Sequence, residues 1–128
     1  MNNQRILNIG RWMFALTFVM GGILHLTGPE FTATQVPEAF GAPIFWVYFT
    51  GIAQIAFAVS ALIRKYDQLA ALLLCLMMLV FIFSMHIPKA ASGDFMGVIS
   101  TMRDFGYAGA ALLYAGGIAR DRIFTPAS

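Results

Sequence analysis

The feature that most constrains this chain is a series of four long apolar runs, separated only by short polar or proline-containing segments. A helix needs about 20 residues to cross the roughly 30 Å hydrocarbon layer of a membrane. Runs of that length predict four transmembrane helices, at about 6–26, 44–63, 68–87 and 98–119. Gly28-Pro29 is expected to end the first helix and Pro88 the third, because proline cannot continue a helix in the ordinary way.

The composition also favours a membrane protein. Hydrophobic residues make up 59% of the 128 residues and charged residues only 11%, whereas soluble domains are about half apolar and a quarter charged. Mean hydropathy is +0.76. A chain of this size forms one domain, so we expect residues 1–128 to be a single transmembrane domain. The eight Lys and Arg form no patch interleaved with aromatic residues, and nucleic-acid binding is not expected.

The first apolar run superficially resembles a signal peptide, because Arg5 precedes it. Its length of about 20 residues exceeds the roughly 7 to 15 of a signal-peptide core. It ends in His25-Leu26-Thr27-Gly28-Pro29 without a small-x-small cleavage site. We therefore expect this segment to remain part of the protein.

Lys and Arg at the ends of the runs predict one orientation. Short connections make consecutive helices antiparallel, so an all-α, up-down four-helix bundle is expected. One side would hold Arg5, Arg11, Arg64, Lys65, Arg120 and Arg122, and the other only Lys89 and Arg103. The positive-inside rule places the six in the cytoplasm, together with both termini.

This orientation brings the ionisable residues of the helices to one depth. His25 and His86 fall at the outer ends of the first and third helices, and Arg103 and Asp104 lie in the first two turns of the fourth. Ionisable side chains at membrane depth cost several kcal/mol unless paired or hydrated, and they usually mark function. We predict that these four residues share a polar pocket open to the outer side.

Helical spacing adds further side chains to this predicted pocket. Tyr107 follows Asp104 by one turn, and Phe18 lies below His25. Gln54 would lie about 15 Å below the outer surface. The predicted ligand-binding residues are Phe18, Thr50, Gln54, Arg103 and Tyr107.

Simpler interpretations of these residues stay open. Arg103 and Asp104 are also typical of an interface, with Asp favoured in the first turn of a helix by the macrodipole. A histidine at the end of a span is often only an interfacial residue, and Gln54 could serve only as a hydrogen-bond link between helices.

Small residues predict close helix packing in three of the four runs. Glycine allows membrane helices to approach closely. The glycines expected to pack are Gly21, Gly22, Gly51, Gly106, Gly109, Gly116 and Gly117.

Several short segments, in this order and spacing, resemble the DoxX family of bacterial membrane proteins over nearly the whole chain. They are Gly22-Ile23-Leu24-His25-Leu26 followed by Pro29-Glu30, Val36-Pro37 and Pro43-Ile44-Phe45-Trp46-Val47-Tyr48-Phe49-Thr50-Gly51, His86-Ile87-Pro88, and Arg103-Asp104 with Ala108-Gly109-Ala110-Ala111-Leu112.

The resemblance implies a four-helix bundle in a bacterial inner membrane. The family takes its name from a subunit associated with quinone-linked thiosulfate oxidation in archaea. Relatives are linked to quinone or oxidative stress, and distant animal relatives resemble membrane chaperones for receptor assembly. The chain departs from thiol-quinone enzymes of similar shape because Cys75 is its single cysteine, which excludes a disulfide or CxxC pair within this chain.

Three functions remain open from the sequence. In the first, a quinone-linked oxidoreductase subunit, His25, His86 and Asp104 hydrogen-bond a quinone and relay protons, and Arg103 stabilises negative charge. In the second, a non-catalytic membrane partner or assembly factor, the polar cluster only locks the helices together. In the third, His25 and His86 are axial ligands of a haem or bind a metal. A homo-oligomer is compatible with all three.

Overall fold

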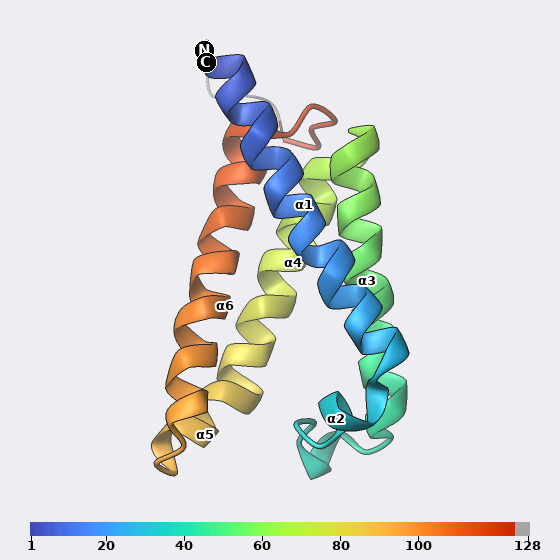
Figure 1. Cartoon of the computed structure of the whole chain (residues 1–128), viewed down its shortest axis with the longest axis vertical. Helices are drawn as coiled ribbons and strands as arrows, with labels where there is room; N and C mark the ends of the chain where they lie inside the picture. Colours follow the sequence, from blue (N-terminus) through green and yellow to red (C-terminus); the bar gives the residue numbers. More distant parts are fainter. Residues whose placement is uncertain (125–128) are drawn as a thin grey trace.

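The computed structural model describes residues 1–124, and every regular element in that range is helical. The long α-helices are α1 (Asn3–Thr27), α3 (Pro43–Ile63), α4 (Asp67–Phe81) and α6 (Phe95–Leu113) (Figure 1). The short helices are α2 (Pro29–Ala33), η1 (Glu38–Phe40) and α5 (Ile87–Ala91). Two π-helical turns, η2 (Ile82–His86) and η3 (Tyr114–Ile118), directly follow α4 and α6.

Three helical segments in the described part of the chain are long and apolar enough to cross a membrane. They are Asn3–Thr27, Pro43–Ile63 and the continuous stretch Asp67–Ala91. The segment formed by α6 is not among them, because Arg103, Asp104 and several glycines lower its hydropathy. Large Ile, Leu, Phe and Met side chains are exposed along all the long helices. This apolar surface is compatible with a lipid bilayer and far exceeds what soluble monomers usually expose.

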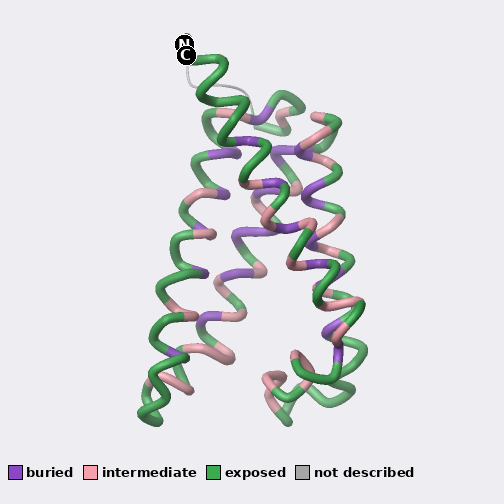
Figure 2. The backbone as a smooth tube through the Cα atoms, viewed as in Figure 1, coloured by how far each residue is buried: buried purple, intermediate pink, exposed green. Residues whose placement is uncertain are grey.

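The long helices are arranged as two pairs. Helix α1 packs along α3, and α4 packs along α6. The two pairs meet at the end of the molecule where α1 begins, which we call the closed end, and diverge toward α2 and α5, which we call the open end (Figure 1). Most buried positions lie toward the closed end, on the faces where helices meet (Figure 2).

The core lies in the closed half and consists largely of alanine and aromatic residues. Small side chains let helices approach, and the aromatic rings fill the space between them. The core residues are Ala15, Phe18, Phe57, Ala58, Ala61, Ala71, Leu74, Cys75, Met78, Ala108, Ala111, Tyr114, Ala115 and Ala119.

Glycines set the spacing between α1 and α3, as predicted. A Cβ atom on Gly51 would lie 2.7 Å from the Cβ of His25, and one on Gly22 would lie 2.8 Å from the Gly51 carbonyl oxygen. The prediction was wrong for α6 and η3. A Cβ atom on any of their predicted packing glycines would meet nothing within 4 Å, because these residues lie on the outward face; they are Gly106, Gly109, Gly116 and Gly117.

The prediction that Pro88 ends the third helix was also wrong, because the helical chain continues to Ala91. The Ile87 amide donates to the Ile82 carbonyl, five residues back, which forms the π-helical turn η2. Pro88 then lies in the first turn of α5, where a missing N–H group is tolerated. Gly28-Pro29 does end α1, and Pro29 begins α2.

A buried carboxylate organises the closed end. Asp67 is 0% exposed. It accepts hydrogen bonds from the Tyr114 hydroxyl at 2.9 Å and from the backbone amides of Arg120 and Asp121 at 3.2 and 2.9 Å. From the sequence, Arg64-Lys65-Tyr66-Asp67 is expected only to form a tight turn between two helices. The carboxylate in fact ties the start of α4 to the end of η3.

We expect Gly22→Ala to lower the free energy of unfolding by about 1–3 kcal/mol, the usual cost of overpacking. The added methyl group would collide with Ile55 and with the Gly51 backbone. Gly109→Ala is the matched control, because its methyl group would enter open space. Chemical unfolding in mixed micelles measures both variants, and equal effects would contradict the close approach of α1 to α3.

Candidate functional site

Three of the predicted site residues form a continuous chain of contacts near the open end. The His86 Nε2 atom lies 2.8 Å from Asp104 Oδ2, and Arg103 Nε donates to Asp104 Oδ1 at 2.9 Å. The exposed fractions of the side chains are 12% for His86, 4% for Asp104 and 52% for Arg103. Asp104 is thus a buried carboxylate whose two oxygen atoms orient one partner each.

Local backbone geometry brings these residues together. His86 is the last residue of the π-helical turn η2, and such turns occur frequently at functional sites. Helices α5 and α6 cross closely at Gly97, where a Cβ atom would lie 2.7 Å from the Cβ of Lys89. This crossing places the η2 segment beside the first turns of α6, so that His86 reaches Asp104.

The other predicted polar residues form a separate group between α1 and α3. His25 Nδ1 lies 3.2 Å from the Val47 carbonyl oxygen and 3.1 Å from Thr50 Oγ1. Gln54 Nε2 lies 3.4 Å from His25 Nε2. A carbonyl oxygen can only accept, so Nδ1 carries the proton and donates, which leaves Nε2 to accept from the Gln54 amide. Both ring nitrogens of His25 are therefore engaged by α3.

Aromatic rings close the space between these two groups on the side of the core. The Phe18 and Tyr107 ring centroids lie 5.3 Å apart in an edge-to-face contact between α1 and α6. Phe18 also contacts Phe57 of α3 at 5.5 Å. Phe18 lies nearer the closed end than His25, and Tyr107 lies nearer the closed end than Arg103 and Asp104. The two rings therefore form the floor of the region between the diverging pairs.

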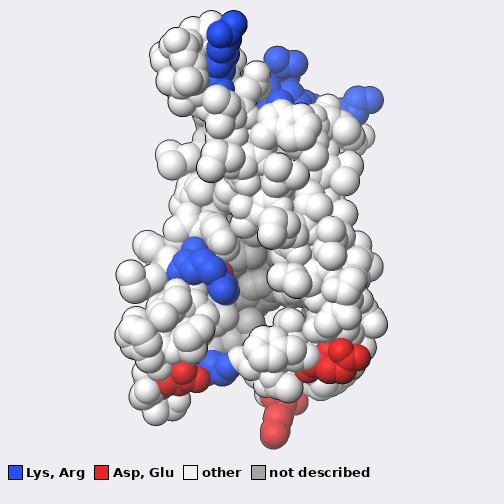
Figure 3. Space-filling view, viewed as in Figure 1, with Lys and Arg blue, Asp and Glu red and all other residues white. Residues whose placement is uncertain are grey.

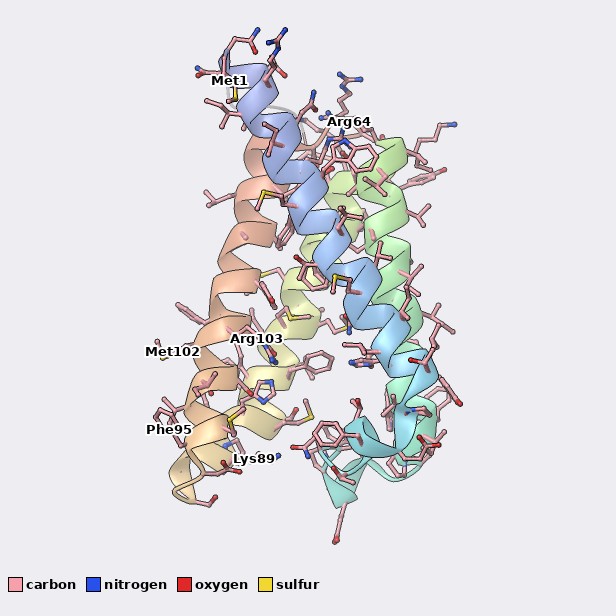
Figure 4. The ribbon with its side chains drawn as sticks, in the orientation of Figure 1. Met1, Arg64, Lys89, Phe95, Met102 and Arg103 are labelled. Atoms are coloured by element: carbon pink, nitrogen blue, oxygen red, sulfur yellow. The ribbon has the colours of Figure 1, made fainter. Side chains whose placement is uncertain are left out.

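The space-filling view shows a hollow on one face of the molecule, beside a group of basic side-chain atoms (Figure 3). The side-chain view places Arg103 on the side of α6 that faces this region (Figure 4). The hollow lies where the two helix pairs diverge. It is therefore bordered by a helix pair that carries His86, Asp104 and Arg103 and by a pair that carries His25 and Gln54.

The single cluster predicted from the sequence is thus resolved into two groups. Within the described residues, no hydrogen bond or ion pair joins His25 to His86, Arg103 or Asp104. The structure does unite His86 with Asp104 and Arg103, and His25 with Thr50 and Gln54. Sequence spacing gave the depth of each residue but did not specify which helices are neighbours.

The His86 group has unused hydrogen-bonding capacity that a ligand could meet. His86 Nδ1 has no hydrogen-bond partner among residues 1–124, and the Arg103 guanidinium uses only Nε. Asp104 compensates the Arg103 charge and fixes the orientation of the imidazole, as carboxylates do for histidines in many sites. The group can therefore offer a cationic donor and a histidine nitrogen to the same ligand.

Lys89 is a further basic residue near the site that was not predicted there. It lies toward the open end below Arg103 (Figure 4). Its position three residues after His86 was the available signal, because residues three apart share a helix face. The prediction that Pro88 ends the helix concealed this relation.

The fold and the site define an all-helical protein with membrane-compatible apolar helices and two polar groups, each with one buried member, Gln54 or Asp104. A family model described as "Domain of unknown function (DUF8561)" matches residues 14–116, and the chain belongs to this family. The matched range includes every residue of both polar groups. A search of curated proteins and a search of solved structures each found no match.

We expect Asp104→Asn to lower the free energy of unfolding by about 1–3 kcal/mol, because it leaves two cationic or polar partners facing a neutral amide. Glu38→Gln is the matched control, since Glu38 is exposed and makes no side-chain hydrogen bond in the described part of the chain. Chemical unfolding in mixed micelles compares the two. An Asp104→Asn protein as stable as the control would show that the pairing contributes nothing to folding.

Proposed function

We propose that the chain is a DoxX-like four-helix protein of the bacterial inner membrane, with its helices in an up-down bundle and both termini in the cytoplasm. The continuous helical segment from Phe95 to Ile118 supplies the fourth span. Basic side chains gather at the closed end (Figure 3). This asymmetry supports the orientation, because cytoplasmic ends of membrane helices carry an excess of Lys and Arg.

The hollow between the helix pairs binds a quinone in this proposal, and the chain acts as a quinone-linked subunit of an oxidoreductase or oxidative-stress system. The observation that carries the proposal is the His86–Asp104–Arg103 chain at the edge of a hollow whose floor is aromatic. A quinone ring is flat and apolar, with carbonyl oxygens that accept hydrogen bonds. Aromatic rings suit its faces, and Arg103 and histidine suit its oxygens.

Each side chain has a distinct task in this function. Arg103 donates to a carbonyl oxygen and stabilises the negative charge that accumulates there when electrons arrive from a partner protein. His86 exchanges a proton with the same end of the ligand, and Asp104 keeps the imidazole and the guanidinium in place. Phe18 and Tyr107 support the ring at the floor of the hollow.

The α1–α3 group contributes the opposite wall. Gln54 and His25 set its polarity, while Thr50 holds the imidazole. His25 is the weaker candidate for proton transfer, because α3 engages both of its ring nitrogens. It acts mainly by positioning Gln54.

A non-catalytic membrane partner or assembly factor is the second candidate. The observation that favours it is the complete pairing of Asp104 and His25, since Asp104 has a partner for each oxygen atom and His25 has one for each ring nitrogen. Such pairing is also expected of residues that only join helices.

The geometry does not favour a bis-histidine haem site. The Nε2 atoms of His25 and His86 face Gln54 and Asp104, respectively. Axial ligation through these atoms would require both contacts to break.

We expect the purified protein in lipid nanodiscs to bind a short-chain ubiquinone analogue and to gain thermal stability from it. Arg103→Gln and His86→Gln should each weaken binding by about tenfold or more, equivalent to ~1.4 kcal/mol, because each removes a contact to the ligand oxygen. Titration calorimetry measures the affinity, with Arg5→Gln at the closed end as the control of equal charge change.

The same experiment separates the two candidate functions. Failure of the wild-type protein to bind any quinone would overturn the quinone proposal. If the double variant His86→Gln, Asp104→Asn also fails to fold, the assembly interpretation is supported. If the double variant folds but loses quinone binding, the purely structural interpretation is wrong.

A further inference from the structure

A second cavity lies at the closed end, away from the hollow described above. Its volume is about 340 Å³. Its lining includes Gln4, Leu7 and Asn8 of α1 and Arg64 at the end of α3. Ile118, the last residue of η3, and Arg120, two residues further, line it on the other side. The cavity therefore combines two guanidinium groups, two side-chain amides and two apolar side chains.

The two arginines of this cavity form no ion pair with the carboxylates of residues 1–124. Both ion pairs in that range involve Asp104, near the open end. Asp67 is engaged by Tyr114 and by two backbone amides. Asp121 accepts from the Tyr66 amide at 2.6 Å. The carboxylates closest in sequence to Arg64 and Arg120 thus have other hydrogen-bond donors.

Arg64 has hydrogen-bonding capacity that the described residues do not use. Its Nη2 atom donates to the Ile118 carbonyl oxygen at 2.6 Å, while its Nε atom is buried without a partner among the described residues. Burial, followed by repulsion from Arg120 and Arg11, lowers the pKa of the Arg64 guanidinium from its usual value. A bound anion would offset this repulsion.

Arg11 orients another donor toward the same cavity. Its guanidinium is held by the Ala61 carbonyl oxygen at 2.8 Å and donates to Asn8 Oδ1 at 3.3 Å. Because Oδ1 of Asn8 accepts this bond, the NH₂ group of Asn8 is the end left to a ligand. The cavity lining therefore presents donors and no carboxylate.

The backbone conformation of Arg64 also indicates that its side chain has a role at this position. Its φ is +59°, in the left-handed region, where glycine would end the helix at lower cost. An arginine in this conformation costs about 1 kcal/mol. The side chain contributes what glycine could not, namely the hydrogen bond to the Ile118 carbonyl oxygen and a guanidinium group in the cavity lining.

We propose that this cavity binds a phosphate group, held between Arg64 and Arg120 with the amide of Asn8 as an additional donor. Guanidinium groups match phosphate oxygens in geometry and charge, often with two parallel hydrogen bonds. The phosphate can belong to an anionic lipid head group or to a free phosphate compound. Leu7 and Ile118 suit a lipid, and basic pockets between membrane helices on the cytoplasmic side bind such head groups.

The test uses the full chain in detergent and measures its thermal unfolding midpoint. One arm adds inorganic phosphate, and another adds dioleoylphosphatidylglycerol, with dioleoylphosphatidylcholine as the zwitterionic comparison. We expect a concentration-dependent rise of the midpoint with phosphatidylglycerol, with inorganic phosphate, or with both. A response to the lipid alone assigns the site to a head group, and a response to inorganic phosphate assigns it to free phosphate.

Arg120→Gln is the decisive variant, because its side chain makes no hydrogen bond within the described residues and its loss should leave the fold intact. We expect it to weaken binding by about tenfold. Lys65→Gln removes the same charge from an exposed position outside the cavity lining, and it should retain binding within about twofold. The proposal is wrong if neither ligand raises the midpoint, or if both variants weaken binding equally. Quinone binding at the other end has no bearing on either outcome.

Discussion

The hydrogen bond between the Tyr114 hydroxyl and the Asp67 carboxylate is the interaction on which the arrangement of the helices depends. It fixes the Tyr114 side chain at the junction of α6 and η3. The Tyr114 ring then contacts Phe57 of α3, with centroids 5.8 Å apart. A buried carboxylate is costly unless its acceptors are satisfied. Asp67 meets this condition only when the end of η3 lies against the start of α4, so the closed end has one favoured geometry.

The open end follows from this constraint. The two helix pairs are joined in the closed half by aromatic contacts, among them the contact between Phe57 and the Tyr114 ring that Asp67 holds in place. They diverge beyond the contact between Phe18 and Tyr107. Each pair positions its own polar residues. The close approach of α1 to α3 at their glycines brings His25 to Thr50 and Gln54, and the π-helical turn η2 brings His86 to Asp104. The molecule therefore combines a fixed end with a hollow bordered by polar groups, which is the arrangement that the proposed quinone function requires.

Much of the fold could be predicted from the sequence because hydrophobic length and helix-ending residues are local properties. The starts and ends of the long helices lie close to the predicted positions, and the pairing of His86 with Asp104 follows from their common depth. The separation of His25 from this pair could not be predicted, because periodicity does not specify which helices are neighbours. The outward position of Gly106 and Gly109 has the same cause.

Rules based on local sequence also gave wrong predictions where contacts elsewhere in the fold change the outcome. A proline ordinarily ends a regular α-helix, yet the π-helical turn before Pro88 lets the helical chain continue. In the sequence, Asp67 resembles an ordinary helix-start residue. Only the folded chain brings the Tyr114 hydroxyl and two backbone amides close enough to satisfy its buried carboxylate. Buried polar contacts between distant segments are thus the part of this structure that the sequence pattern conceals.

The most direct measurement of the proposed function is the position of a bound quinone, mapped with a photoreactive azidoquinone and peptide mass spectrometry. We expect covalent labelling of residues that border the hollow, from His86 to Tyr107, and loss of that labelling when unlabelled quinone competes. Labelling confined to the lipid-facing surfaces of the helices, unaffected by the competitor, would contradict it.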